Sequence, residues 1–442
     1  MQRFINTLRN IWKIDDLKNR ILVTLGLLLV YRLGTHIVLP GINPNELSAL
    51  SQKTAEGVLG LLDMFSGGAF SNASIMALGI MPYISASIVI QLLSIAVPYF
   101  QRLQKEGESG RRKITQLTRY LTIIILLLQA PSYIASLHGM LPPSAFVMSG
   151  TLFTVTSVLI LTAGTIFVMW IGEKITDRGL GNGISLVIMV GIIARLPFAL
   201  AAEFFSRVEE QGGGLVIFLV EIIMLVVVIV FAILLTRGTR KVAVQYAKRI
   251  VGNKQYGGTR QYIPLKVNAA GVMPIIFAQA LMFIPVMLLG FATSDNLTGV
   301  AAAFADYTSW AYNLTFALLI IGFTYFYTAI TVNPNQMAED MKRNGGFIPG
   351  VKPGEKTAEY LDTIMSRITL PGSMFLALIA ILPAFAKIAG VNNQFAGFYG
   401  GTSLLIMVGV ILDTLQQIES HLLMRHYDGL LKSGRIKGRR SI

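Results

Sequence analysis

The side chains that most often carry catalysis or bind metals are scarce and scattered in this 442-residue chain. It has no cysteine, which excludes a disulfide bond, a thiolate metal site and a cysteine nucleophile. The four histidines do not cluster, which argues against a metal site, and no Ser/His/Asp set can be picked out. We therefore expect neither enzyme activity nor a bound cofactor. The histidines are His36, His138, His421 and His426.

One glycine-rich stretch has the spacing of a phosphate-binding loop without its chemistry. Gly345 and Gly350 are spaced as in such a loop, but Val351 and Lys352 follow where a lysine and a serine or threonine are needed. The sequence therefore predicts no nucleotide site. Any driving force must come from a partner or from the membrane potential.

Ionisable residues inside apolar segments are also few, with Arg32, Glu221 and Asp413 as the candidates. An ion-coupled transporter usually needs buried carboxylates or histidines as a relay. The segments expected to line a cavity carry Ser, Thr, Asn, Gln and Ile instead, and these side chains provide no specific binding site for a transported molecule. A secondary transporter for a small solute is the alternative function, and a membrane-embedded enzyme ranks third.

Membrane spans are the elements that must position all these residues. The chain is 53% hydrophobic and only 14% charged, a composition typical of a polytopic membrane protein. Ten apolar windows are long enough to cross a hydrocarbon core of roughly 30 Å. They are residues 17–39, 75–97, 116–138, 151–172, 183–202, 215–235, 268–291, 310–332, 368–387 and 402–424.

Positive charge predicts the orientation of these spans. Of the 37 Lys and Arg residues, 32 lie in segments that the ten spans place on one side, together with both termini. Cytoplasmic segments carry an excess of Lys and Arg, so we expect this side to be cytoplasmic. The opposite side holds only Lys53, Arg195, Arg207 and Lys387.

Two segments on the basic side are longer than a connection between bundled helices requires. Residues 237–266 alternate polar and apolar side chains around Gly257-Gly258, which predicts a basic hairpin clear of the bilayer. Residues 333–367 carry two helical stretches around a segment rich in glycine and proline. Ordered basic loops of this kind favour docking of a large acidic partner, such as a soluble protein or ribosomal RNA.

Residues 63–97 begin a membrane crossing that is not one continuous helix. The run 63–74 is short, small and half polar, and Gly79 and Pro82 interrupt the apolar segment that follows. Irregular backbone at membrane depth is tolerated only where it is buried in protein or lines a water-filled cavity. The sequence therefore predicts that this segment faces an interior.

Several motifs resemble those of the bacterial SecY family, which forms the central subunit of the Sec protein-conducting channel. The resemblance runs from about residue 17 to about residue 430, in order and at family spacing. The motifs are MFSGGA at 64–69, ALGIMPYISASI at 77–88, KEGESGRRK at 105–113, RGLGNGIS at 178–185, PLKVN at 264–268, the Pro-Gly pairs at 349–350 and 353–354, and GGTSLLI at 400–406.

The resemblance implies an all-α membrane protein of ten transmembrane helices. They would form two pseudo-symmetric five-helix halves, 1–202 and 203–442, around an hourglass pore with a plug and a lateral gate. A ring of aliphatic side chains would form the constriction, and two pairs of them have the i, i+4 spacing of one helix face. The ring residues would be Ile80, Ile84, Ile184, Ile188, Ile276 and Ile406.

The resemblance also assigns a plug and a gate. The plug would be a short helix at about 63–74, with a small polar surface that can leave the pore at little desolvation cost. A polar cluster would hold the gate closed reversibly. The plug residues would be Phe65, Ser66, Gly67, Gly68, Ala69, Phe70, Ser71 and Asn72. The gate residues would be Ser85, Gln91, Thr122, Asn268 and Ile284.

Partners follow from the same resemblance. The loops 237–266 and 333–367 would dock the SecA motor or the ribosome, and Lys352 stands where the family typically has an arginine, which removes bidentate recognition. SecE would be obligate and SecG a further subunit; YidC, accessory Sec proteins, anionic lipids and ribosomal RNA are other expected contacts. The docking residues would be Arg240, Lys241, Lys248, Arg249, Lys254, Arg260 and Lys352.

The expected function is that of a passive, gated conduit in the bacterial cytoplasmic (inner) membrane. It would recognise signal sequences, pass unfolded precursors across and release transmembrane segments sideways into lipid. SecA, the ribosome or the proton-motive force would supply direction.

Overall fold

The computed structural model divides into two compact units. Unit 1 comprises residues 1–198 with 410–442, and unit 2 comprises residues 199–409. The division into halves at 202 and 203 stays a prediction. The structure describes residues 14–47, 50, 57–148, 150–210, 214–246, 249–251, 254–256, 260–289 and 306–432.

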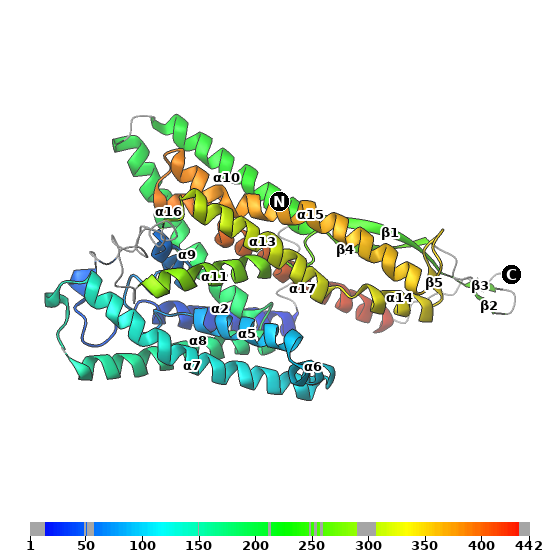
Figure 1. Ribbon diagram of the computed structural model, residues 1–442, viewed down its shortest axis with the longest axis horizontal. Helices are drawn as coiled ribbons and strands as arrows, with labels where there is room; N and C mark the ends of the chain where they lie inside the picture. The colour runs from blue at the N-terminus through cyan, green and yellow to red at the C-terminus, as the bar shows by residue number, and fades with distance from the viewer. Residues whose placement is uncertain are drawn as a thin grey trace. The chain divides into compact units, whose positions relative to one another are not determined.

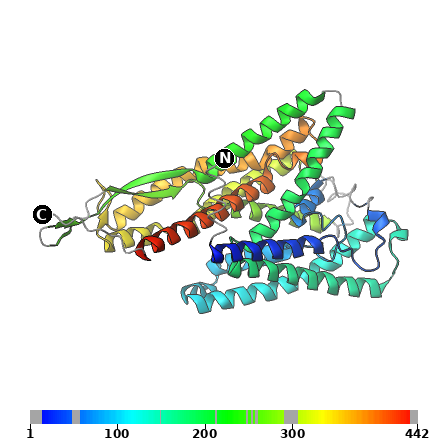
Figure 2. The same cartoon turned by 180° about the vertical axis from the view of Figure 1, so that it is seen from behind.

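Unit 1 is built mainly from long apolar helices that pack side by side. Helix α7 packs against α5 and α8, and α8 also packs against α2; Figure 2 shows α2, α8 and α7 running side by side. The elements are α2 Asp15–Gly34, η1 Pro44–Glu46, α4 Gly57–Ser66, α5 Met81–Ala96, α6 Pro98–Lys105, α7 Glu108–Met140, η2 Pro143–Ala145, α8 Thr151–Arg178, most of α9 Gly183–Phe205, and the later part of α17 Gly401–Lys432.

Unit 2 combines apolar helices with a small sheet. Helix α13 packs against both α11 and α15, and α14 packs on α15. The elements are the π-helix η3 Ser206–Glu210, α10 Gly214–Arg237, β1 Thr239–Tyr246, β2 Arg249–Val251, β3 Lys254–Tyr256, β4 Arg260–Lys266, α11 Met273–Leu289, α13 Trp310–Thr331, α14 Pro334–Arg343, β5 Gly346–Phe347, α15 Glu355–Ile388 and α16 Asn393–Ala396. The last residues of α9 and the first residues of α17 also belong to unit 2.

Seven helices within the described residues are long and apolar enough to cross a membrane: α7, α8, α9, α10, α13, α15 and α17. The other expected spans, 17–39, 75–97 and 268–291, overlap α2, α5 and α11. Helix α2 carries five charged residues, α5 ends before a 100° bend into α6, and α11 has 17 residues. The structure therefore supports a protein with many apolar spans, and the count of ten stays a prediction.

The two long basic loops join into one module, which Figure 1 shows alongside the first half of α15. Strand β1 pairs antiparallel with β4, with Val242 opposite Ile263, which confirms the predicted hairpin. The second loop supplies α14, the start of α15 and the two-residue strand β5, which pairs with the other edge of β1. We call residues 239–266 and 333–367 the docking module; the pairing of β5 with β1 makes it a single piece.

The docking module has a hydrophobic core of its own. Val242, Val244 and Leu265 from the sheet pack with Met341, Leu361 and Met365 from α14 and α15. Val242 and Val244 are buried, Ala243 and Gln245 are half-buried, and the exposed residues of β1 are its first three, Thr239, Arg240 and Lys241. Alternation over residues 242–245 therefore directs the two valines to this core, while the basic start of β1 lies in solvent.

Leu361→Ala is expected to loosen the docking module. Leu361 is 1% exposed in this core, and removing a buried leucine side chain costs about 2–5 kcal/mol. Limited proteolysis should cut residues 239–266 at least tenfold faster than in the unmodified protein. Asp362→Ala, one exposed position further along α15, is the control, and equal cutting rates in the two variants would contradict the shared core.

Candidate channel site

Residues 63–74, predicted as the plug, begin in α4 and continue as turns. The prediction of a short helix over 63–74 is wrong in its bounds, because α4 ends at Ser66 and turns occupy the residues up to the start of α5. The reason lies in two consecutive glycines: Gly67 and Gly68 have φ angles of +67° and +90°, in the left-handed region that glycine adopts without strain.

A charge pair ties this segment to α9. Arg195 donates from one terminal nitrogen to a carboxylate oxygen of Asp63 and to the hydroxyl of Ser71 at 2.7 Å. The other oxygen of Asp63 accepts from the backbone N–H of Ser71 at 2.8 Å. Asp63 therefore joins the beginning and the end of the glycine turn, and Arg195 holds both. The side chain of Asp63 is only 7% exposed.

Residues of α2 hold the turn from another side. Arg32 donates to the carbonyl oxygen of Gly67, and the hydroxyl of Tyr31 donates to the carbonyl oxygen of Ser66 at 3.2 Å. Arg32 was one of the few ionisable residues that the sequence placed within an apolar span. The structure gives it a backbone partner there.

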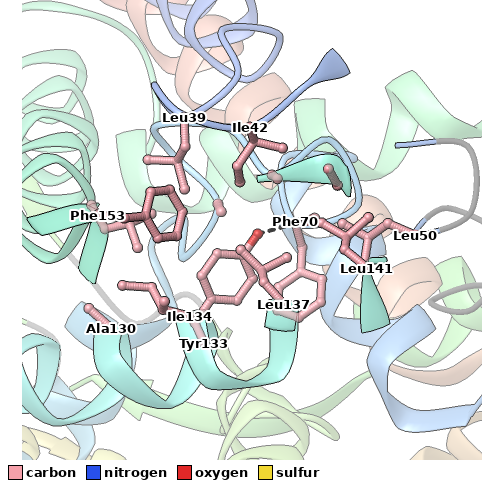
Figure 3. Close-up of a cluster of buried hydrophobic side chains, with 14 residues drawn as sticks. Leu39, Ile42, Leu50, Phe70, Ala130, Tyr133, Ile134, Leu137, Leu141 and Phe153 are labelled. Carbon is pink, nitrogen blue, oxygen red and sulfur yellow. Dashed lines mark hydrogen bonds between the residues drawn. The ribbon is translucent and has the colours of Figure 1, made fainter. Parts of the chain in front are cut away.

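The far end of the segment packs into the core of unit 1. Figure 3 shows Tyr133 of α7 with its hydroxyl pointing to Phe70; it donates to the Phe70 carbonyl at 3.0 Å, and the two rings meet edge to face at 4.8 Å. Ser74 forms an isolated β-bridge with Val38. The expected small polar surface is thus mostly buried: Ala69, Phe70 and Ser71 are all under 9% exposed.

Arg195 contacts the predicted plug at Asp63 and Ser71, and the sequence analysis did not include it among the candidate site residues. The charge analysis placed Arg195 outside the membrane, although it falls within the apolar window 183–202. In the structure it lies in α9. An arginine inside a span without an acidic neighbour on its own helix was the available signal, because such a charge needs a buried partner. Its partner, Asp63, lies 132 positions away in the sequence.

The six predicted ring residues fall in both units. Ile80 and Ile188 are buried in unit 1, and Ile84 and Ile184 are half-buried there. Backbone close to them meets the predicted plug: a methyl group at Gly191 would lie 3.1 Å from the Phe65 carbonyl oxygen.

In unit 2, Ile406 is buried and Ile276 half-buried. A methyl group at Gly409, one turn from Ile406, would lie 3.2 Å from Val272, one turn before Ile276. The residue before α11 thus lies against α17, and each of the two predicted ring residues is one turn away from this contact. A ring of all six stays a prediction.

The predicted gate residues make local contacts. Thr122 donates to the Thr118 carbonyl at 2.7 Å and Gln91 to the Ser87 hydroxyl at 3.3 Å; Ser85 is half-buried on α5. Asn268 lies in a turn before α11, whereas the window 268–291 predicts a helix there, and its side-chain oxygen is buried without a partner among the described residues. Ile284 lies on α11.

The predicted docking residues fall within the residue ranges of the docking module. Arg240 and Lys241 on β1, Arg260 on β4 and Lys352 before α15 are exposed. Arg249 and Lys254 belong to β2 and β3, a small hairpin of their own. Lys248 lies outside the described residues. Within the part of the chain that the structure describes, no group of His, Asp and Glu could hold a metal ion.

Comparisons with known proteins agree on one family. The family model described as SecY matches residues 74–415. The protein translocase subunit SecY of Streptomyces coelicolor is 43% identical over 433 residues, which are 95% of this chain and 98% of that protein.

Two solved structures share the fold. One describes the SecY plug domain as stabilising the closed translocation channel and maintaining a membrane seal; it is 17% identical, covers 95% of both chains and has a TM-score of 0.55. The other is Sec61 in the canine ribosome-channel complex from the endoplasmic reticulum, 16% identical, with 95% of both chains covered and a TM-score of 0.56.

Proposed function

The chain belongs to the SecY family, and from that premise we propose that it is the channel subunit through which unfolded polypeptides cross the bacterial cytoplasmic membrane. It is not an enzyme: the family's channel subunit has no energy source of its own. The single observation that carries the proposal is the near full-length match to a translocase subunit. The distribution of Lys and Arg supports an orientation with both termini in the cytoplasm.

The polypeptide path would pass the ring of six isoleucines. An apolar constriction sheds water and so blocks ions, yet it offers no hydrogen bond or charge that would retain a passing peptide. The approach of α17, at Gly409, to Val272, the residue before α11, supports a shared lining by Ile276 and Ile406.

Residues 63–74 would be the plug that seals the resting channel. The likeness to a SecY whose plug domain stabilises the closed state supports this role, as do the contacts of Asp63 and Gly67 with Arg195 and Arg32. Five consecutive residues of the MFSGGA motif, 65–69, are buried in unit 1. The plug would thus be held by polar contacts and packing, both of which can re-form after a precursor has passed.

Release of hydrophobic segments would occur through a lateral gate at Ser85, Gln91, Thr122, Asn268 and Ile284. The side-chain oxygen of Asn268, which is buried without a partner among the described residues, supports a polar gate, because such an unsatisfied amide oxygen costs about 1–3 kcal/mol. An incoming hydrophobic segment gains about 0.3–0.6 kcal/mol for each Leu, Ile or Phe moved into lipid. The sum over a segment of about 20 residues is enough to compete with such a gate.

Disulfide trapping tests the path. Because the chain has no cysteine, Ile276→Cys introduces a single thiol, and a precursor with one cysteine is arrested halfway through translocation and oxidised. A cross-link that forms only with the engaged precursor is the expected result. Leu281→Cys, exposed on the same helix, is the control. No cross-link at 276, 80 or 406 with an arrested precursor would move the path elsewhere and revive the small-solute transporter.

The docking module would bind the cytoplasmic partners, SecA or the ribosome with its RNA. Its exposed basic residues support an acidic partner, and the likeness to Sec61 in a ribosome complex supports the ribosome. SecE as an obligate subunit, SecG, YidC, accessory Sec proteins and anionic lipids remain proposals from the family resemblance.

Lys352→Glu is expected to reduce SecA-driven translocation about tenfold, the effect of 1.4 kcal/mol. Lys352 is exposed between the two Pro-Gly pairs, so the change reverses a charge without touching the core. Lys356→Glu is the matched control, because that lysine is equally exposed and lies against Glu359 at 2.8 Å. Lys352→Arg, which restores a bidentate donor, should be at least as active as the unmodified protein. Equal losses in both glutamate variants would mean that net charge alone matters.

A further inference from the structure

Unit 2 contains a buried charge cluster that the channel mechanism does not use. Its members are Glu203 near the end of α9, Arg207 in η3 and Glu221 in α10. Arg207 donates from Nε to Glu203 at 2.9 Å and from a terminal nitrogen to Glu221 at 2.6 Å. One guanidinium thus serves two carboxyl groups. The side chains of Glu203 and Glu221 are 0% and 9% exposed.

The cluster has one more negative charge than positive charge if both glutamates are ionised. Among the residues whose side chains the structure describes, Lys387 does not offset it, because it lies over the ring of Tyr307, 4.8 Å from its centre, and its charge acts on Asp306. The hydroxyl of Tyr399 donates to the backbone carbonyl of Glu221 at 2.7 Å and not to its carboxylate. Burial, followed by the nearby carboxylates, raises the pKa of Tyr399, so this hydroxyl remains a neutral donor.

One carboxyl oxygen of the cluster, on Glu221, has no hydrogen-bond partner among the described residues. Glu203 uses its second oxygen to accept from the backbone N–H of Asn392 at 2.7 Å. The second oxygen of Glu221 is buried. An ionised carboxylate with an unpaired buried oxygen is strongly disfavoured. The carboxyl groups of Glu203 and Glu221 accept from adjacent nitrogens of the Arg207 guanidinium, Nε at 2.9 Å and a terminal nitrogen at 2.6 Å, so the two groups lie next to each other.

We propose that Glu203 and Glu221 form a proton-binding site in which the two carboxyl groups share one proton. Two carboxyl groups on neighbouring nitrogens of one guanidinium repel each other when both are charged, and a single proton removes that repulsion. With the proton in place, one negative charge faces one positive charge. The proton also gives the free oxygen of Glu221 the hydrogen bond that it lacks. This inference does not depend on the proposed channel function.

The site joins segments that are distant in the sequence. Arg207 also donates to the carbonyl of Gly390 at 2.6 Å, so the α9–α10 connection is fastened to the segment between α15 and α16. Loss of the proton adds a second buried negative charge to this junction. The junction is therefore expected to weaken as the surrounding pH rises.

The test uses the full-length protein in detergent, with thermal unfolding measured from acidic to alkaline pH. The folded protein would hold a proton that an unfolded glutamate, with a pKa near 4.3, has already lost. Stability is then complete at low pH and falls as pH rises through the titration of the pair, by up to tenfold in the unfolding equilibrium per pH unit. Glu221→Gln, which resembles the protonated acid, should unfold at a midpoint that exceeds that of the unmodified protein by a margin growing with pH.

Two further measurements isolate the effect of the shared proton. Glu419→Gln removes an exposed carboxylate on α17 and should follow the unmodified protein at every pH. If Glu221→Gln does not fold, the infrared carbonyl band of a protonated carboxyl group, present in the unmodified protein at neutral pH and lost on alkalinisation, reports the same proton. Parallel pH curves, or the absence of that band, would overturn the proposal. A midpoint that rises when sodium replaces choline at fixed pH would assign the site to a metal cation instead.

Discussion

Arg195→Met is expected to make the resting channel leak ions. The change leaves Asp63 buried without its cation, and loss of one partner from a buried ion pair costs about 3–5 kcal/mol. Because the Arg195 side chain keeps 27% of its surface exposed, we take the lower end, which corresponds to roughly a hundredfold larger population of displaced plug. Ion efflux from vesicles containing the purified channel, with no precursor, measures this population.

A double-mutant cycle identifies the pair as the cause. Asp63→Asn keeps an oxygen for the backbone N–H of Ser71 but removes the charge, and it should leak less than Arg195→Met. The double variant should leak no more than the worse of the two single variants, because residues of one ion pair are not additive. Arg195→Lys, which keeps the charge, should leak least. A tight seal in all four proteins would show that packing around Phe70 and Tyr133 holds the segment unaided.

Ile406→Asn is expected to relax the selection of signal sequences. An amide in an aliphatic constriction attracts water and removes part of the barrier that a correct signal sequence normally overcomes. Export of a precursor with a defective signal should rise about tenfold, the effect of 1.4 kcal/mol. The assay compares this precursor with the same precursor carrying an intact signal. Ile406→Leu, which keeps the side chain aliphatic, should behave like the unmodified channel.

Unchanged export of the defective precursor in Ile406→Asn, with normal export of the intact one, would remove Ile406 from the ring. Ile406 is 2% exposed, so the amount of folded protein is measured in the same membranes. A variant that fails to accumulate is replaced by Ile276→Asn. That side chain is half-buried and has more room to accept an amide.

Periodicity and motif spacing predicted most of the helices and the hairpin of the docking module. Alternation in residues 241–246 requires a strand, and the structure pairs it with residues 260–266 as expected. Helix starts were less predictable. Residues 75–80 are as apolar as a membrane-spanning helix. The glycine turn and the β-bridge of Ser74 with Val38 nevertheless hold this backbone in turns, so α5 begins only at Met81.

Contacts between distant residues were beyond prediction from one sequence. Nothing in the local sequence around Asp63 indicates Arg195, and nothing around Glu203 indicates Glu221 or Asn392. The two-residue strand β5 is another example, because Gly346-Phe347 has no strand pattern of its own and becomes a strand only through its pairing with Gln245 and Tyr246. These features depend on tertiary packing.

The 34 residues of α15 form one helix that starts in the docking module and ends next to Gly390. At 1.5 Å per residue, it is a rod about 50 Å long. Torque applied by a partner at the module would therefore travel along a single backbone to the junction at Arg207. Pro371 and Pro383 interrupt its hydrogen-bond ladder, and a rod with two such joints bends at them first. Bending at Pro371 and Pro383 would therefore decide how much of that torque reaches Gly390 and Arg207.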